Sequence, residues 1–371
     1  MASKSIGCWF SHKKKKKVNV KQLALLFQDY DASLKEIDLD SDLEQQGPFD
    51  AIVHKVTDLM IERLDGNEVA AQKMKDFESY LAKHPNTVVV DPLLSLEKLI
   101  KRYETYKLIQ ETNICSRDKV IQVPTFTFIK SKNRAVILKQ MKEADVHFPI
   151  VCKKNIAHGT ESHKMMVIFN EDGLADVDPP CVAQTFIDHN ALLYKIYVIG
   201  DKYHMVERPS LRNFSKSEWT THKTIFFNSH NISSGDSQRS DLTKVEATDG
   251  DAMPIDTVIV QTLTKQLYQD IKMTLYGVDI IVCPKTNKHY VIDVNVFPGY
   301  DGVDDFLNTL VDCVMAQIKQ FKAVDRDICC DLKMAAKTNS VENGHNEMKI
   351  LNGIRPEVHV NGHMNGTTTN S

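Results

Sequence analysis

The sequence lacks the cysteine patterns of a metal-binding or disulfide-stabilised protein. Its eight cysteines stand singly apart from Cys329–Cys330, and it contains neither a CxxC pair nor a Cys/His metal spacing. We therefore expect free thiols in a reducing compartment. The net charge is only −3 over 371 residues. Bulk attraction to nucleic acid or to a membrane surface is thus not indicated, and any affinity for anions must come from local clusters of cations.

Long apolar runs are missing as well. None approaches the length that spans a bilayer. The apolar stretch near the N-terminus is too short for a signal peptide, and its charges lie on the wrong side. With 42% hydrophobic and 26% charged residues, the composition predicts a globular cytoplasmic protein without membrane insertion.

Three common phosphate-binding motifs are absent. The chain has no GxxxxGK(S/T) loop, no HRD and DFG pair of the protein kinases, and no GxGxxG after its first strand. If this protein uses ATP, it must do so on another fold.

The length favours two or three domains. Residues 1–110 alternate apolar runs such as Ala51–His54 and Thr87–Val90 with amphipathic helices, which predicts an α/β domain with a largely parallel sheet. Asn19 and Ser95 are expected to cap helices there.

Two further lobes are predicted at 111–190 and 191–323. In the second, residues 284–288 read as a turn between the strands Val278–Cys283 and His289–Val296. The stretch Ser233–Asp256 is rich in small polar residues and is expected to be mobile. From 324 to 371 the periodicity is lost, and a disordered tail is predicted.

The second strand of that hairpin carries the strongest chemical signal. Alternate residues of a strand share a face, so Asp293 and Asn295 point the same way, and Asp279 on the partner strand can lie opposite them. Two carboxylates and an amide oxygen suit magnesium that carries nucleotide phosphates. The plainer alternative is that Asp293 caps a turn, but a carboxylate on each of two apolar strands is costly unless compensated.

A second signal is Lys153, at the end of the apolar strand Pro149–Cys152 and before a loop of small residues around Gly159. Its ammonium and the N–H groups of the loop suit nucleotide phosphates. A lysine at a strand end is more often a solvated charge, and one glycine makes a weak phosphate loop.

The third signal is the uninterrupted run Lys13–Lys17 after the first strand. Loops at the carboxyl ends of strands commonly bind ligands in α/β sheets, which favours a polyanion here. A solvated face or a nuclear localisation signal is the alternative interpretation. The segment Gln184–Asn190 joins the two later lobes. Its backbone can pair with an adenine edge, although the same sequence also suits an ordinary strand and turn.

At these residues the chain resembles the ATP-grasp enzymes, and more narrowly the inositol-tetrakisphosphate 1-kinase (inositol-1,3,4-trisphosphate 5/6-kinase) family. The resemblance covers about residues 6–314. Seven segments carry it in the family's order: 9–14, 52–55, 89–92, 157–160, 208–214, 226–230 and 293–300.

The resemblance implies a site. Magnesium, expected as two ions, would lie on Asp279, Asp293 and Asn295, with Lys153 and Asp293 as the catalytic residues. ATP phosphates would meet Arg102 and Lys153. Substrate phosphates would meet Lys14, Lys55, His163 and Lys195, near Asn295 and Gly299. The nucleotide cleft would be lined by Gln184, Thr185, Phe186, Ile187, Asp188, His189, Asn190, Ala191, Leu192, Leu193, Tyr194, Lys195, Ser210, Ser229 and Ser233.

Some of these assignments carry alternatives. Glu often stands at the position of Asp293 in other ATP-grasp enzymes, which favours the inositol-kinase branch. The register of the lysine run is open by one residue, so that Lys13 can replace Lys14. The resemblance implies a monomer that binds ATP and inositol tris- and tetrakisphosphates, and no nucleic acid. It also implies in-line phosphoryl transfer to an inositol hydroxyl. An ATP-grasp carboxylate–amine ligase and a non-catalytic polyanion-binding module are the competing hypotheses.

Overall fold

The computed structural model describes residues 3–112, 120–233, 240–245 and 251–339, with side chains up to residue 323. Contacts divide the chain into two units, 1–321 and 322–371. Parts of the predicted mobile stretch and of the predicted tail lie outside the described residues. In the described part, none of the helices combines the length and the apolar character that crossing a membrane requires.

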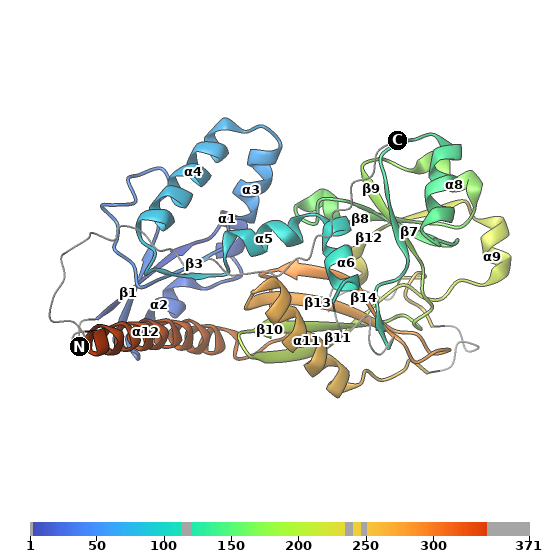
Figure 1. The fold of residues 1–371 in the computed structure, drawn as a ribbon. Coiled ribbons are helices and arrows are strands. Elements are labelled where there is room, and N and C mark those ends of the chain that lie inside the picture. The colour runs from blue at the N-terminus through green and yellow to red at the C-terminus, as the bar shows by residue number, and fades with distance from the viewer. Residues whose placement is uncertain (1–2, 113–119, 234–239, 246–250, 340–371) are drawn as a thin grey trace, which may run out of the picture. The chain divides into compact units, whose positions relative to one another are not determined.

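The first sheet is parallel throughout. Its four strands follow the order β2-β1-β3-β4, and each neighbouring pair runs in the same direction. Asn19 caps α2 by accepting from the Gln22 N–H, as expected. Helices α3 and α4 lie together beside this sheet in Figure 1. The elements are β1 (Lys4–Trp9), α1 (His12–Lys15), α2 (Val20–Gln28), β2 (Ala32–Glu36), β3 (Ala51–His54), α3 (Thr57–Leu64), α4 (Glu68–Lys83) and β4 (Val88–Val90).

Two short helices, α5 (Leu93–Ile100) and α6 (Arg102–Gln110), follow this sheet. The expected cap at Ser95 is wrong, because α5 begins at Leu93 with Pro92 in the capping position, and Ser95 is buried inside the helix. Proline favours a helix start since it has no N–H to leave unpaired and its φ is already fixed.

The second sheet has five strands in the order β12-β8-β7-β9-β6, all antiparallel to their neighbours. An apolar cluster on one face packs it against α8. The elements of this region are β5 (Ile121–Gln122), which joins the third sheet, β6 (Phe126–Ile129), α8 (Arg134–Glu143), β7 (Ile150–Lys154), η1 (Thr160–His163), β8 (Lys164–Ile168), η2 (Glu171–Asp176), β9 (Cys181–Thr185), α9 (Lys216–Thr221), β12 (Thr224–Asn228) and α10 (Ser229–Ser233).

The third sheet also has five strands, in the order β11-β10-β13-β14-β5. The predicted hairpin is β13 paired antiparallel with β14, and a bulge lies between Asp279 and Ile280. The elements are β10 (Leu192–Ile199), β11 (Lys202–Pro209), α11 (Thr257–Ile271), β13 (Leu275–Val282), β14 (His289–Val296) and α12 (Phe306–Asn339). Since α12 continues to Asn339, the backbone of 324–339 is helical, in contrast to the predicted tail.

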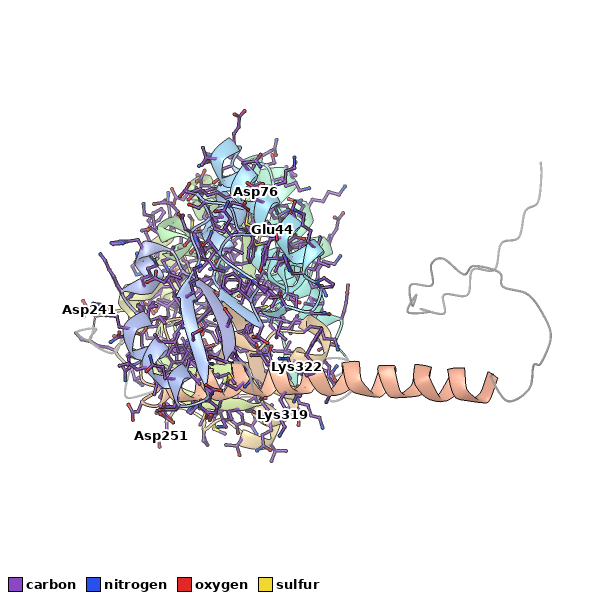
Figure 2. The ribbon with its side chains drawn as sticks, turned by 90° about the vertical axis from the view of Figure 1, so that its left-hand side faces the viewer. Glu44, Asp76, Asp241, Asp251, Lys319 and Lys322 are labelled. Carbon is purple, nitrogen blue, oxygen red and sulfur yellow. The ribbon has the colours of Figure 1, made fainter. Side chains whose placement is uncertain are left out.

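A buried carboxylate joins the first sheet to the third. Asp91, directly after β4, accepts hydrogen bonds from the N–H groups of Thr274 and Leu275 at the start of β13. Charged side chains such as Glu44, Asp76 and Asp241 are exposed at the surface, where Figure 2 labels them. The Asp91 carboxylate differs from them because it is buried.

Candidate active site

Two buried carboxylates face each other across the β13–β14 hairpin. Asp279 and Asp293 are partners in the strand register, and Asn295, two residues further along β14, pairs with Gly277. The side chains of Asp279 and Asp293 are only 14% and 12% exposed. The strand register thus sets Asp279 opposite Asp293, and Asn295 lies on the same face of β14 as Asp293.

Each carboxylate is paired with a cation from another element. Arg102, at the start of α6, contacts Asp293 (Nη2 to Oδ2, 3.1 Å). Lys195, on β10, contacts Asp279 (Nζ to Oδ2, 3.1 Å). These pairs compensate the cost of burying the carboxylates, which would be several kcal/mol for an unpaired ion.

The pKa values show how tightly the charges are coupled. Burial and the charge of Asp293 raise the pKa of Asp279, although Lys195 opposes them. Burial acts in the same direction on Asp293, but Arg102 and Lys153 outweigh it and lower the pKa of that carboxyl. Burial acts to lower the pKa of Lys195, yet the charge of Asp279 raises it. We regard both pairs as ionised at neutral pH, because each ion compensates its partner.

This donor set suits a magnesium ion whose other ligands are oxygens of the nucleotide phosphates. Within the described residues, no group of three His, Cys, Asp or Glu side chains gathers as a self-contained metal centre. Magnesium needs no such group, since one or two carboxylates, water and substrate oxygens commonly complete its shell. The arrangement of Asp279, Asp293 and Asn295 fits that description.

Lys153 reaches into the same site from β7. It is buried, and its ammonium donates to the carbonyl oxygen of Ile292 (2.7 Å), to Oε1 of Gln184 (3.1 Å) and to the hydroxyl of Tyr106 (3.2 Å). Burial lowers its pKa to about 8, against the pull of Asp293. The lysine is therefore held beside the residue that precedes Asp293 rather than solvated.

Arg102 is the most heavily bonded side chain of the site. Besides Asp293, its guanidinium donates to the backbone oxygens of Lys154 (2.8 Å), Ile156 (3.3 Å) and Ser162 (3.4 Å), while its Nε is buried without a partner in the structure. Arg102 thus connects the loop after β7 to strand β14.

One cavity gathers nine of the seventeen predicted nucleotide-binding residues. Its polar lining includes Lys153, Asp279 and Asp293, and its apolar lining suits a flat base. Gln184 offers a second buried and unpaired group there, its Nε2. The cavity is lined by Pro124, Val151, Lys153, Met165, Gln184, Thr185, Phe186, Ile187, His189, Ser210, Leu211, Phe227, Ser229, Ile232, Ser233, Asp279, Ile281, Ile292 and Asp293.

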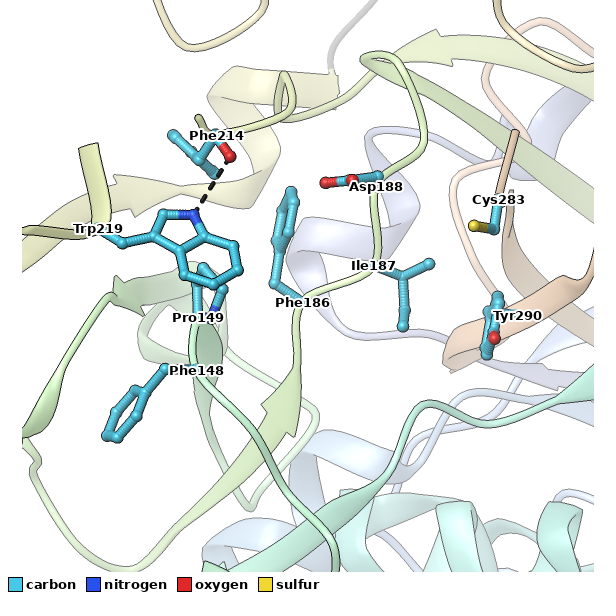
Figure 3. Close-up of a pocket in the computed structure, with 9 residues that line it drawn as sticks. All are labelled: Phe148, Pro149, Phe186, Ile187, Asp188, Phe214, Trp219, Cys283 and Tyr290. Carbon is cyan, nitrogen blue, oxygen red and sulfur yellow. Dashed lines mark hydrogen bonds between the residues drawn. The ribbon is translucent and has the colours of Figure 1, made fainter. Parts of the chain in front are cut away.

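A second cavity shares Phe186 and Ile187 with the first (Figure 3). Aromatic side chains dominate it, and Trp219 donates from its indole N–H to the Phe214 carbonyl (3.2 Å). Lys153 and the two carboxylates are not part of this lining, and we therefore place the chemistry in the first cavity.

A cluster of cations adjoins the end of β14. Lys14 and Lys55 both donate to the carbonyl oxygen of Phe297, at 3.1 and 3.0 Å, and Lys14 also donates to that of Pro298 (2.6 Å). Lys14 is 5% exposed, with its ammonium 3.8 Å above the Phe297 ring. Lys14 therefore anchors the chain after β14, whereas its neighbour Lys13 is exposed.

The charges of this cluster repel one another. Burial, together with the nearby Lys13 and Lys17, lowers the pKa of Lys55 to about 8. Burial, His230, Arg102 and Lys13 lower that of His163 to about 4. A polyanion would relieve this repulsion.

Other predicted residues lie at different places. Several lie at the start of β10, beyond the cavity lining: Asn190, Ala191, Leu193 and Tyr194 are buried there, and Leu192 is partly buried. Asp188 pairs with Lys285 at the surface. The Gly299 backbone lies beside Lys17 and Asp301. Sequence reasoning missed Tyr106 and His230, since no local motif marks a tyrosine on a helix or the second member of a histidine pair.

Comparison with known proteins shows which family this chain resembles in sequence. Residues 5–96 match the family model of the inositol 1,3,4-trisphosphate 5/6-kinase pre-ATP-grasp domain, and residues 115–316 match that of its ATP-grasp domain. The chain is 40% identical over 312 residues to an inositol-tetrakisphosphate 1-kinase from Xenopus laevis, covering 84% of this chain and 78% of the relative. It is 38% identical over 308 residues to the protein of the same name from Danio rerio, covering 83% and 77%.

Solved structures support the fold alone. An ATP-grasp ligase in complex with a minimal precursor superposes with a TM-score of 0.51 at 11% identity, covering 85% of this chain and 100% of that one. A D-cycloserine synthetase superposes with a TM-score of 0.53 at 8% identity, covering 85% and 99%. The predicted ATP-grasp fold and the predicted family are both confirmed. The chain belongs to the inositol 1,3,4-trisphosphate 5/6-kinase family of ATP-grasp enzymes.

Proposed function

We propose that this protein transfers the γ-phosphoryl group of ATP to a free hydroxyl of an inositol polyphosphate. The acceptors are the 5- or 6-hydroxyl of inositol 1,3,4-trisphosphate and the 1-hydroxyl of inositol 3,4,5,6-tetrakisphosphate. The family and the names of the relatives support these substrates.

One observation carries the proposal. The opposed carboxylates Asp279 and Asp293 stand beside Lys153 in a cavity with an apolar lining, and a separate cluster of cations adjoins the same strand at Phe297. A kinase that joins two polyanions needs both halves, one for nucleotide and metal and one for the acceptor's phosphates.

In the reaction, the acceptor's oxygen attacks the γ-phosphorus and the bond from that phosphorus to the bridging oxygen of ADP breaks. The hydroxyl proton leaves to solvent. Lys153 holds positive charge at the phosphate chain, and Gln184 and the linker backbone orient the base. Lys55, His163 and Lys13 or Lys14 hold the acceptor's phosphates, and Lys195 does so once released from Asp279.

Magnesium, when bound, neutralises charge on the β- and γ-phosphates. Asp279, Asp293 and Asn295 would hold it, and both carboxylates would exchange their cation partners to do so. Arg102 would then be free to contact a phosphate, with its unpaired Nε as a further donor. Because Asp293 would be a metal ligand, metal ligation would compete with a role for it as a general base.

The competing ligase activity would form an acyl-phosphate on a carboxylate substrate and has no use for the cation cluster. A binding module without catalysis has no use for the opposed carboxylates. A monomeric state and a cytoplasmic location stay predictions. The free, buried Cys8 and Cys152 suit a reducing compartment.

The test is incubation of the purified protein with magnesium, ATP and a panel of inositol tris- and tetrakisphosphates, with products resolved by ion exchange. We expect a more highly phosphorylated product from the wild type and at least about a hundredfold less from Asp293→Asn, since a metal ligand is lost. Asp145→Asn is the matched control, because that carboxylate is 81% exposed. ATP binding without any inositol product would refute the kinase proposal in favour of the ligase.

A further inference from the structure

A carboxylate stands among the cations of the acceptor site. Asp58 lies in the first turn of α3, three residues after Lys55. It is hydrogen-bonded to Nε2 of His158 and accepts from the hydroxyl of Ser11, and its charge acts on Lys55. A negative charge here is unexpected in a site for a polyanion, because it repels the ligand.

The three partners of Asp58 come from the three segments that carry the cations. Ser11 directly precedes α1, which holds Lys13 and Lys14. Lys55 follows β3. His158 lies in the loop after β7, which leads to His163 at the end of η1. Asp58 thus bonds to two segments that are distant from it in the sequence, and its charge acts on Lys55 nearby.

Asp58 keeps its charge at neutral pH. Burial acts to raise the pKa of its carboxyl, but the hydrogen bonds from His158 and Ser11, together with the charges of His158 and Lys55, lower it to about 2. An ionised acceptor forms stronger hydrogen bonds than a neutral one.

Arg102 holds the same loop on both sides of His158. Arg102 donates to the Ser162 carbonyl (3.4 Å), and the Ser162 hydroxyl donates to that of Gly159 (2.7 Å). Gly159 has a φ of 85°, in the region that favours glycine. Asp58 adds a contact from α3 to the loop that presents His163, beside those that Arg102 and the backbone of Ile100 supply.

We propose that Asp58 is a positioning residue for the acceptor, which holds the lysine segment, Lys55 and the His158–His163 loop in the geometry that binds the phosphates of an inositol polyphosphate. This inference rests on the proposed function. It names a residue that touches no phosphate and acts through the cations around it.

The positioning role and simple electrostatics predict opposite changes in the affinity for a polyanion when Asp58 is removed. If Asp58 were only a nearby negative charge, its removal would strengthen polyanion binding. If it positions the cations, its removal weakens binding despite the gain in positive charge. Losing a hydrogen bond to a charged group costs about 1.5–3 kcal/mol, or roughly a 10- to 150-fold change in affinity.

The experiment measures binding and turnover separately. Inositol 1,3,4-trisphosphate is titrated calorimetrically into wild type, Asp58→Ala, Asp58→Asn and His158→Ala, and steady-state KM values are obtained for ATP and for the inositol phosphate. We expect Asp58→Ala to raise Kd and KM for the inositol phosphate at least about tenfold, with KM for ATP within about twofold. Asp58→Asn, which keeps one acceptor oxygen, should fall between Asp58→Ala and wild type.

Glu161→Gln is the matched control. It removes a carboxylate from the same loop, but its side chain is 69% exposed and paired only with Lys164 in the described contacts. We expect its affinity to be unchanged or slightly higher. Urea unfolding of each variant shows whether the fold is kept, and His158→Ala supplies a second route to the same prediction should Asp58→Ala fail to fold.

Each outcome decides something. Weaker inositol phosphate binding by Asp58→Ala and His158→Ala, with ATP unaffected, supports the proposal. Unchanged or tighter binding refutes it while leaving the kinase intact. A wild type that neither binds nor phosphorylates an inositol phosphate overturns the proposed function, and the role of Asp58 falls with it.

Discussion

Replacing Tyr106 with phenylalanine removes one hydroxyl from the interior of the site. That hydroxyl donates to the Ile292 carbonyl (2.7 Å) and accepts from the ammonium of Lys153 (3.2 Å). Tyr106 is fully buried, and burial raises the pKa of its phenol well above the usual value, so the O–H stays a donor. Phenylalanine keeps the ring that packs on Phe126, which confines the change to a single oxygen.

The expected magnitude follows from the remaining contacts. A hydrogen bond that involves a charged group contributes about 1.5–3 kcal/mol. Lys153 keeps Gln184 and the Ile292 carbonyl as acceptors, so we expect the lower end, about 1.5 kcal/mol. That corresponds to a roughly tenfold loss in kcat/KM for ATP. The loss of an acceptor also disfavours the charged form of Lys153 and therefore lowers its pKa further.

The assay is kcat/KM for ATP from pH 6 to 10, which reports the ionisation of the free enzyme. Lys153 must be protonated to hold a phosphate, so wild-type kcat/KM should fall as the pH rises through about 8. In Tyr106→Phe the same fall should begin at lower pH. Tyr103→Phe is the control, because that ring stacks on Phe128 and its hydroxyl makes no described contact with Lys153. Identical alkaline limbs for wild type and Tyr106→Phe would refute a coupling between Tyr106 and Lys153.

Two further predictions concern the lysine run and the core. Lys14→Met should lower the free energy of unfolding by about 1–3 kcal/mol in urea titrations, because it removes a donor that bonds to two carbonyl oxygens. Lys13→Met should leave stability unchanged and raise KM for the inositol phosphate. Equal stability of the two variants would contradict the anchoring role of Lys14. Leu263 on α11 is only 1% exposed. Leu263→Ala should lower the free energy of unfolding by about 2–5 kcal/mol through the cavity it creates, and the folded variant should keep its KM for ATP. A loss of unfolding free energy below about 0.5 kcal/mol would show that the α11 packing is not as described.

Much of the site is already readable in the chain. The alternation of polar and apolar residues along 289–296 fixes which side chains share a face, because a strand repeats every two residues. The hairpin partner is near in sequence, so Asp279 was paired with Asp293 correctly, and the family resemblance supplied the fold. The parallel first sheet follows from alternating strands and helices.

Other features depend on contacts between distant segments, which the local sequence pattern does not predict. Arg102 and Asp293 are 191 residues apart, and Lys14 meets Phe297 from 283 residues away. The same holds for Asp58, whose contact with His158 spans 100 residues. The sequence by itself determined the family, and it singled out the strand of the proposed metal ligands and the residues proposed to bind phosphate. Only the tertiary structure decided which of those cations are already paired, because the pairing is set by burial and by the register of sheets that the chain assembles from widely separated strands.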